Sequence, residues 1–276
     1  MLIRTPKVSG SFYPSNPQSI REEISNLLAL EQEKQVMSLD TNHIIGGIIP
    51  HAGYRYSGLE AVQFFRLAGL YAKKVDTFVI IHPDHYGSGI SVSTDPHDAW
   101  RSPFGNVNID VEMRDLLDLP RATGMNDREH AAEVLVPFLQ YFIPYEFEIL
   151  PVSMLEQNMK NAQALGRALT EVTKQLNRRI MLLASSDFSH YVQPEEGHYL
   201  DGLVIDRIAA FDPEGLYETI IDNNISVCGY GPIMSLLFYA QMVAEIPKVK
   251  ILARGNSGKI SGSGQVVDYV SAIFFE

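Results

Sequence analysis

The chain has 276 residues, of which 46% are hydrophobic and 20% charged, with a formal net charge of −11 and one cysteine. A chain of this length and composition folds as one large domain or two small ones, so dominant disorder is excluded. With one cysteine, the chain cannot form an internal disulfide. The acidic balance, without a basic tract, argues against nucleic acid or an anionic membrane as a partner.

No stretch of the sequence is long and apolar enough to span a membrane. The most apolar stretch, Ile233–Val243, falls well short of the roughly 20 apolar residues that a spanning helix needs. The first ten residues show no hydrophobic run behind Arg4, so no secretory signal is visible. We therefore expect a reduced, cytoplasmic protein.

Apolar runs of β type alternate with longer segments of helical period along the chain. An amphipathic helix is predicted near the start, where Ile20, Ile24, Leu27 and Leu28 form one stripe. Four short runs rich in Ile and Val predict strands buried on both faces: Ile44–Ile49, Thr77–Ile81, Phe147–Val152 and Ile180–Ala184. Four further segments predict helices: Leu59–Tyr71, Asp127–Phe142, Asn158–Asn177 and Pro232–Glu245. Pro137 should kink the second of these helices.

The alternation of strand and helix predicts a single α/β domain over residues 1–276, with a mostly parallel or mixed central sheet and helices on both faces. The C-terminal part breaks the pattern, because Val249–Arg254 and Val266–Phe275 indicate an antiparallel β-hairpin on that sheet. The loop between them, Gly255–Gly264, does not fit a Walker motif, and no Rossmann fingerprint follows a strand. We therefore predict no nucleotide.

Three of the predicted strands run into residues that can bind a metal or transfer a proton. These residues are His51 after the first strand, His82 and His85 after the second, and Asp187 and His190 after the fourth. In an open α/β sheet the carboxyl ends of the strands form the crevice where ligands bind. We therefore expect these side chains to converge at one edge of the sheet.

The only cysteine, Cys228, comes just before the helix predicted from Pro232. A helix N-terminus lowers the pKa of a nearby thiol and favours the thiolate. Gly229 and Gly231 would allow the backbone to approach a bound group closely. An inert, buried cysteine is the alternative interpretation.

A further cluster, Glu129, His130 and Glu133, lies in the first turns of the helix predicted from Asp127. Residues 130 and 133 share one face of a helix, so Glu133 could orient His130. The alternative is a cluster that compensates the helix dipole.

Three kinds of site fit these residues. With two imidazoles from His51, His85, His130 and His190 and the carboxylate of Asp187, the set is the two-His, one-carboxylate face of a non-haem iron oxygenase. With Cys228 in place of Asp187, the site is softer and favours zinc, copper or thiolate-ligated iron, leaving Asp187 and His190 as neighbouring acid–base groups. Without a metal, Cys228 could be the nucleophile of a thiol hydrolase, with His190 or His51 as base. The spacing leaves these assignments open.

Eight short segments stand out along the chain: Gly10-Ser11-Phe12-Tyr13-Pro14, Pro50-His51-Ala52-Gly53-Tyr54, Pro83-Asp84-His85, Ser102-Pro103-Phe104-Gly105, Glu129-His130 with Glu133, Ser185-Ser186-Asp187-Phe188-Ser189-His190-Tyr191, Cys228-Gly229 and Asn256-Ser257-Gly258. In this order they resemble the MEMO family, which includes the bacterial and archaeal proteins called AmmeMemoRadiSam system protein B. The resemblance runs nearly end to end.

The resemblance implies a fold similar to that of the class III extradiol ring-cleavage dioxygenases, which use non-haem iron. It implies metal ligands at His51, His85 and Cys228, with Asp187 and His190 beside them. It also implies iron or copper as the metal, with zinc as the alternative, and an unidentified small molecule as substrate. Bacterial members of the family are associated with an AMMECR-type partner and a radical SAM protein.

A metal-dependent, dioxygenase-like oxidoreductase is therefore our first hypothesis. In it, His190 moves protons and is oriented by Asp187, while His130 with Glu133 lines the pocket. A non-catalytic module that binds a peptide or partner protein is the second hypothesis, because eukaryotic members of the resembled family are linked to receptor signalling. The chain departs from the family pattern at His82, where Gly is usual, and this adds a further candidate ligand.

Overall fold

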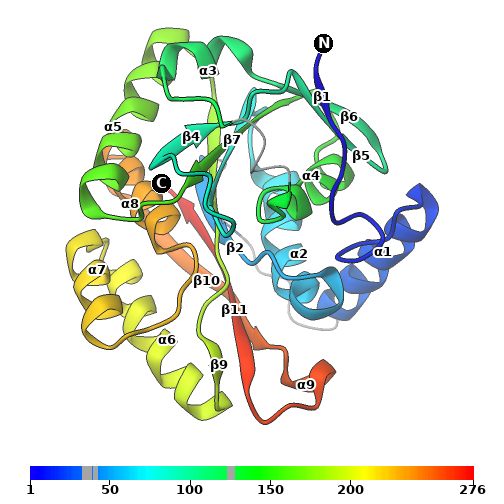
Figure 1. The fold of residues 1–276 in the computed structure, drawn as a ribbon, viewed down its shortest axis with the longest axis vertical. Helices are drawn as coiled ribbons and strands as arrows, with labels where there is room; N and C mark the ends of the chain where they lie inside the picture. Colours follow the sequence, from blue (N-terminus) through cyan, green and yellow to red (C-terminus); the bar gives the residue numbers. More distant parts are fainter. Residues whose placement is uncertain (33–38, 40–42, 123–127) are drawn as a thin grey trace.

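The computed structural model describes residues 1–32, 39, 43–122 and 128–276, which form a mixed eleven-stranded sheet with helices on both faces (Figure 1). In chain order the strands are β1 (Ile3–Arg4), β2 (Ile44–Ile49), β3 (Thr77–Pro83), β4 (Val92–Thr94), β5 (Ala99–Ser102), β6 (Gly105–Ile109), β7 (Glu148–Met154), β8 (Ile180–Ser185), β9 (His190–Val192), β10 (Lys248–Asn256) and β11 (Val266–Phe275). The helices of these residues are α1 (Pro17–Gln32), α2 (Tyr54–Tyr71), α3 (Val111–Leu117), α4 (Val136–Phe142), α5 (Met159–Leu176), α6 (Pro194–Ala209), α7 (Pro213–Asp222), α8 (Tyr230–Val243) and the short α9 (Gly258–Ser261).

The middle of the sheet is parallel, the pairs β5–β6 and β10–β11 on its flanks are antiparallel, and the edge strand β1 pairs parallel with β5. The strand order is β1-β5-β6-β7-β3-β8-β2-β11-β10, and the five strands from β6 to β2 are parallel. On one flank, β10 and β11 form an antiparallel pair that attaches to β2. The predicted α/β fold with a C-terminal hairpin is therefore confirmed. Because the central strands are parallel, their carboxyl ends meet at one edge of the sheet.

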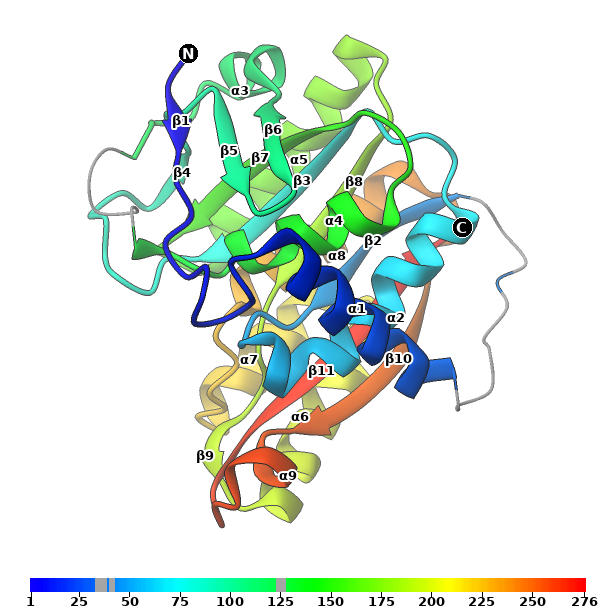
Figure 2. The same ribbon diagram turned by 90° about the vertical axis from the view of Figure 1, so that its right-hand side faces the viewer.

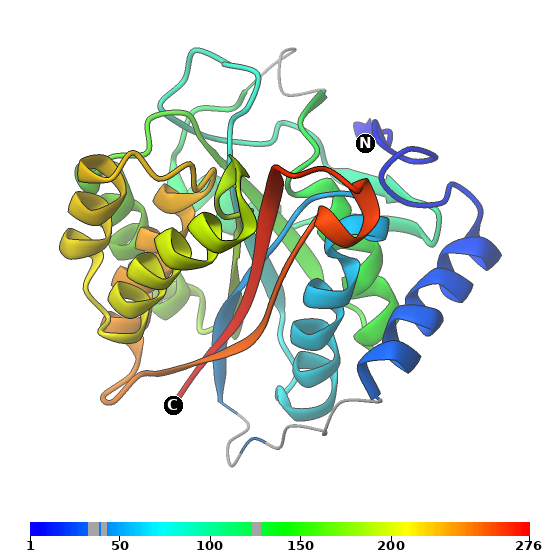
Figure 3. The same ribbon diagram turned by 90° about the horizontal axis from the view of Figure 1, so that it is seen from below.

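Two helical layers enclose the sheet. Helices α1, α2 and α4 cover one face, and Figure 2 shows α1 and α2 lying across its front. Helices α5 to α8 cover the other face, as the view from below shows (Figure 3). The close approach of α2 to β2 requires glycine at the centre of the strand, because a Cβ at Gly47 would lie 2.2 Å from the ring of Phe64.

Helix α8 is buried between the sheet and α5. It contains few polar residues, and the described side chains from Ile233 to Ala240 are all buried. The predicted stripe of α5 packs against it, with Ala162, Leu165 and Leu169 buried. None of the helices in the part of the chain that the structure describes is long and apolar enough to cross a membrane.

The prediction of one helix over Asp127–Phe142 is wrong. Asp127 lies outside the described residues, His130 is in irregular backbone, and a 3₁₀ turn (Glu133–Leu135) precedes α4. Proline has no backbone N–H and is tolerated only in the first turn of a helix. Pro137 therefore marks the beginning of α4 and not a kink within a longer helix.

Candidate metal centre

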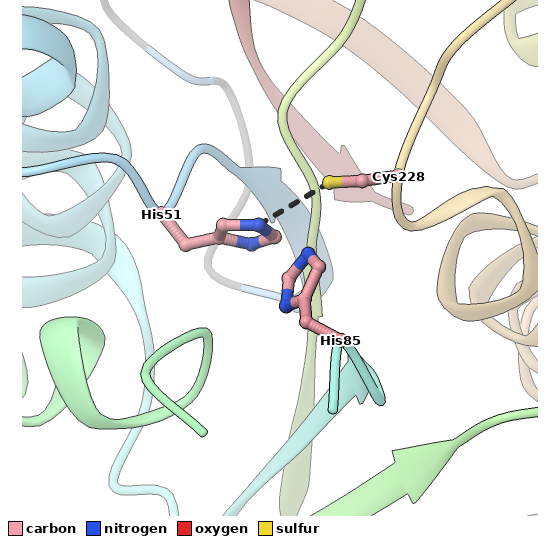
Figure 4. A group of neighbouring side chains, drawn as sticks. All are labelled: His51, His85 and Cys228. Atoms are coloured by element: carbon pink, nitrogen blue, oxygen red, sulfur yellow. Dashed lines mark hydrogen bonds between the residues drawn. The ribbon is translucent and has the colours of Figure 1, made fainter. Parts of the chain in front are cut away.

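Three side chains from distant parts of the sequence meet at the carboxyl edge of the parallel strands. His51 follows β2, His85 follows β3, and Cys228 precedes α8 (Figure 4). The Sγ atom of Cys228 lies 3.2 Å from Nε2 of His51, and the imidazole rings of His51 and His85 are 5.2 Å apart. One ligand atom from each of the three residues lies within 4.8 Å of the others. This spacing can accommodate one cation.

The orientation of His51 follows from a chain of hydrogen bonds. The hydroxyl of Ser185 donates to the carbonyl oxygen of Ala131 over 2.6 Å, so its oxygen must accept from Nδ1 of His51, 2.8 Å away. The proton of the neutral ring is therefore on Nδ1. The lone pair of Nε2 consequently faces Cys228. Burial lowers the pKa of His51 well below its usual value, which also keeps the ring neutral.

His85 is oriented by Glu129. Its Nδ1 lies 3.0 Å from Oε1 of Glu129, and its backbone N–H donates to Oε2 over 2.8 Å. Burial would raise the pKa of Glu129, but the hydrogen bond from His85 and the neighbouring histidines lower it far below its usual value, so the carboxylate is ionised. Nδ1 of His85 consequently carries a proton, and Nε2 is left to bind a metal.

Cys228 docks against the segment that follows β8. Its Sγ accepts from the backbone N–H of Asp187 at 3.2 Å, and its own N–H donates to the carbonyl oxygen of Asp187. Gly229 allows this contact, since a Cβ there would lie 2.3 Å from the carbonyl oxygen of Ser185. The glycine beside the cysteine thus makes room for the protein's own backbone, and the approach of a bound group to this segment stays a prediction.

The expectation of a thiol whose pKa is lowered by a helix N-terminus is wrong. Cys228 lies outside α8, which begins at Tyr230, and burial raises the pKa of its thiol well above the usual value. The charge of Asp187 raises that pKa further. Helix dipoles act over the first turn only, so burial dominates here.

Asp187 and His190 lie near the cluster but are held by different partners. The Oδ1 atom of Asp187 accepts the backbone N–H of His51 over 2.8 Å, and burial raises the pKa of its carboxyl to about 6. The ring of His190 donates from Nδ1 to the carbonyl oxygen of Ser226 at 2.7 Å. The hydrogen bonds that orient the ring of His190 thus go to Ser226, while Asp187 interacts with His190 through its charge.

The expected pairing of His130 with Glu133 is also wrong. Without a helix at residue 130, Glu133 faces the N-terminal segment. It forms a buried ion pair with Arg4 at 2.6 Å and accepts from the hydroxyl of Tyr13 and the backbone N–H of Val8. His130 instead lies beside His85, with ring centroids 5.1 Å apart. Glu133 is thus a structural anchor for residues 4–13.

The N-terminal segment reaches the candidate metal centre through Phe12. The ring of Phe12 lies 4.7 Å from that of His130, and its carbonyl oxygen accepts the backbone N–H of Tyr54, which follows the His51 turn. The Nδ1 atom of His130 is buried and has no hydrogen-bond partner among the described residues. Burial lowers the pKa of His130 to about 4, so the ring is neutral at ordinary pH. His130 is therefore held by packing and by Glu129, whose Oε1 accepts its backbone N–H and lies 3.5 Å from its Nδ1.

His85, Glu129 and His130 form a second group whose ligand atoms lie within 4.8 Å of one another. Both oxygens of Glu129 already accept protein hydrogen bonds, which makes this group less suited to a cation. His82 is in neither group. It is buried, donates from Nδ1 to the carbonyl oxygen of Pro83, and lines a small cavity with Arg4 and Glu129.

Sequence reasoning did not find the roles of Glu129, Ser185 and Phe12. Glu129 and Ser185 each orient an imidazole of the cluster, and Phe12 packs on His130. Carboxylates and hydroxyls commonly orient the histidine ligands of metals, which is the signal that could have directed attention to Glu129. Which histidine it meets depends on the fold.

Comparisons with known proteins identify the family that the sequence matches. The sequence model of the family described as Memo-like protein matches residues 4–273. A MEMO1 family protein of Methanosarcina mazei is 35% identical over 281 residues, covering 100% of both chains. One of Methanocaldococcus jannaschii is 36% identical over 290 residues, covering 98% of both chains. These descriptions name no metal, substrate or partner, so an AMMECR-type or radical SAM partner stays a prediction.

Among solved structures, an uncharacterized protein of Escherichia coli K12 is similar with a TM-score of 0.48 and 12% identity. The match covers 77% of this chain and 91% of that chain. A resemblance of this size does not establish a shared fold.

Proposed function

Because the chain belongs to the family of Memo-like proteins, we propose that it is a metal-dependent oxidoreductase that binds iron or copper through His51, His85 and Cys228. The observation that carries this proposal is the 3.2 Å approach of the Cys228 sulfur to Nε2 of His51, with a ligand atom of His85 in the same group. The sulfur and the imidazole nitrogens are thus close enough to bind one cation together.

The donor set fits a borderline-soft transition metal. Two imidazoles and one sulfur suit iron, copper or zinc, whereas magnesium and calcium prefer oxygen ligands. The protons on Nδ1 of His51 and His85 leave both Nε2 atoms as donors. A cation would also counter the burial that raises the pKa of the Cys228 thiol, because metal binding deprotonates a coordinating thiol.

A bound iron or copper would supply one-electron chemistry, and the surrounding residues supply orientation and proton transfer. Asp187 fixes the backbone on both sides of the cluster, because its carboxylate binds the amide of His51 and its own amide donates to the Cys228 sulfur. The ring of His190 is held through Nδ1 by Ser226, and its Nε2 has no hydrogen-bond partner in the part of the chain that the structure describes. This nitrogen is the group we assign to accept a proton from a substrate.

Anaerobic reconstitution with Fe(II), Cu(I) and Zn(II), followed by metal analysis, tests the ligand set. We expect the native chain to bind close to one equivalent, and the His51→Ala and Cys228→Ala variants to lose most of their affinity. His198→Ala is the matched control, because that histidine is exposed and outside both candidate groups. Equal stoichiometry and affinity in the native chain and in Cys228→Ala would refute the thiolate ligand.

The same contact supports a second candidate, a thiol hydrolase in which His51 activates Cys228. The partner that orients His51 is the neutral Ser185, however, and burial disfavours the thiolate. Alkylation of the metal-free protein by iodoacetamide separates the candidates. Rapid alkylation at neutral pH together with turnover of thioesters or amides favours the hydrolase. Slow alkylation that bound metal abolishes favours the metal site.

A further inference from the structure

A cavity of about 770 Å³ lies at the amino ends of the parallel strands, at the opposite edge of the sheet from the candidate metal centre. The first residues of β2 and β8 line it, together with the last turns of α5 and α8. Ligand sites in proteins commonly enclose about 300–1,000 Å³. The cavity is thus large enough for a small molecule, and no part of the candidate metal centre lines it.

The floor of this cavity is apolar. Ile45, Val75, Ile180 and Tyr239 line it, and each of these side chains is less than 9% exposed. Burial raises the pKa of Tyr239 to about 12, so its hydroxyl is neutral. Ala72, Met242 and Val243 also line the cavity and are only partly buried, so a ligand that covers them gains from the removal of apolar surface from water, at roughly 25 cal/mol per Å².

The rim of the cavity is cationic. Lys73, Lys174, Arg178 and Arg179 line it, whereas no carboxylate is among the described residues that do so. This is unexpected in a chain with 33 acidic and 22 basic residues. Arg178 forms ion pairs with Asp110, Glu112 and Glu148, and His43, which also lines the cavity, pairs with Glu276. The side chains of the other three cations have no acidic partner among the described residues, so they supply unpaired positive charge at the mouth of the cavity.

Compensation of helix dipoles explains only part of this charge. Lys174 lies in the last turn of α5, where a cation is favourable without any ligand. Lys73 lies beyond the end of α2, and Arg179 lies between α5 and β8. Neither Lys73 nor Arg179 is in a helix, and both add positive charge to the same cavity rim as Lys174. An anion at the mouth would interact favourably with all three.

We propose that this cavity binds an amphipathic anion, with a carboxylate at the cationic rim and an apolar acyl or aryl body on the floor. This chemistry fits the cavity, because the apolar lining favours an apolar ligand body and the cationic side chains at the rim favour a negative charge. The proposal is independent of the metal, because Cys228, His51 and His85 are at the opposite edge.

Calorimetric titration of the native chain with octanoate, 2-naphthoate, 1-octanol and acetate tests the proposal. We expect saturable binding of octanoate or 2-naphthoate, and the tighter of the two identifies an acyl or an aryl body. The neutral alcohol and acetate should bind more weakly, because each lacks half of the required chemistry. The same titration of Cys228→Ala excludes a carboxylate held at the candidate metal centre, and its affinity should equal that of the native chain.

Charge reversal then locates the site. In Lys73→Glu/Arg179→Glu we expect about tenfold weaker binding of the anion and unchanged binding of 1-octanol. Lys160→Glu/Arg167→Glu is the matched control, since both residues are exposed on α5, do not line the cavity, and change the net charge equally. All four positions are on the surface, and circular dichroism verifies folding. Absence of saturable binding to the native chain, or equal weakening in both double variants, would overturn the proposal.

Discussion

Glu129 and Glu133 are buried carboxylates four residues apart that serve different regions of the molecule. Glu129 accepts hydrogen bonds from both the backbone and the ring of His85, in the candidate metal centre. Glu133 accepts them from Arg4 and Tyr13, in the N-terminal segment. Both carboxylates are buried, and their positions in the sequence do not indicate which of them contacts a histidine. The comparison teaches that the donors around a carboxylate decide whether it orients a ligand or anchors a segment.

The largest effect is expected where the anchor is broken. Glu133→Gln leaves Arg4, which is 3% exposed, buried without its counter-charge. Breaking one half of a buried ion pair costs about 3–5 kcal/mol, so we expect a loss of that size in the free energy of unfolding, measured by urea denaturation. Arg4→Met/Glu133→Met should lose less, because it leaves no unpaired charge. A loss below about 1 kcal/mol in Glu133→Gln would show that the pair anchors nothing.

A smaller effect, of a different kind, is expected at the carboxylate that orients a ligand. In Glu129→Gln the ring of His85 loses its charged acceptor. Loss of such a partner typically weakens metal affinity by about 10–100-fold, which competition with a chelator would measure. Glu133→Gln, where it folds, should retain more affinity than Glu129→Gln. The reverse order would contradict the division of tasks between the two carboxylates.

A third buried carboxylate, Asp268, differs from both because too few hydrogen-bond donors surround it. Its Oδ2 has no hydrogen-bond partner among the described residues, and it lies against α6, where a Cβ at Gly197 would be 2.1 Å from it. Burial, and then the charge of Asp201, raise the pKa of Asp268 to about 7. Where donors are missing, the buried carboxyl is therefore favoured in its protonated form.

This raised pKa predicts a pH dependence of stability. The pKa of Asp268 is higher in the folded than in the unfolded chain. The protonated carboxyl therefore contributes its full share to the free energy of unfolding below about pH 4, and this contribution is lost as the pH rises through about 7. We expect Asp268→Asn to be more stable than the native chain at pH 8, by about 1–2 kcal/mol, but not at pH 4. Asp206→Asn, at an exposed position on α6, is the control. Parallel pH profiles of the native chain and Asp268→Asn would refute this account.

The smallest effect is expected at Ser185, which orients His51 with a neutral hydroxyl. Ser185→Ala leaves Nδ1 of His51 and the carbonyl oxygen of Ala131 without this partner. Neutral hydrogen bonds contribute about half as much as charge-assisted ones, so we expect metal affinity to fall about fivefold. Chelator competition would measure it beside Glu129→Gln. A larger loss in Ser185→Ala than in Glu129→Gln would reverse the ranking of the two orienting groups.

The sequence predicts the central strands well because they are buried on both faces. The run Ile44–Ile49 coincides with β2, and Asn158–Asn177 differs from α5 by one residue at each end. Continuous apolar runs and 3.6-residue periodicity are local signals that survive folding. Helices α6 and α7 are absent from the sequence-based expectations, although Pro194 and Pro213 in their first turns are start signals.

The partners of individual side chains could not be predicted. The spacing of His130 and Glu133 indicated a pair only if residues 127–142 were one helix, and Pro137 prevents that. Glu133 then meets Arg4, 129 positions away in the sequence. Such contacts depend on how the N-terminal segment packs, which no local pattern encodes. The dipole argument for Cys228 failed for a related reason, because burial depends on the whole fold.

The position of β2 in the sheet has a consequence for synthesis of the chain. Its residues, 44–49, pair with β8, which begins at residue 180, and with β11, which begins at residue 266. At about 5–20 residues per second, a ribosome needs on the order of ten seconds or more to travel from β2 to β11. During that time Ile-Ile-Gly-Gly-Ile-Ile is an apolar strand with free edges, the kind of segment that chaperones protect from aggregation. Slower growth at low temperature and added chaperone should therefore increase the yield of folded protein.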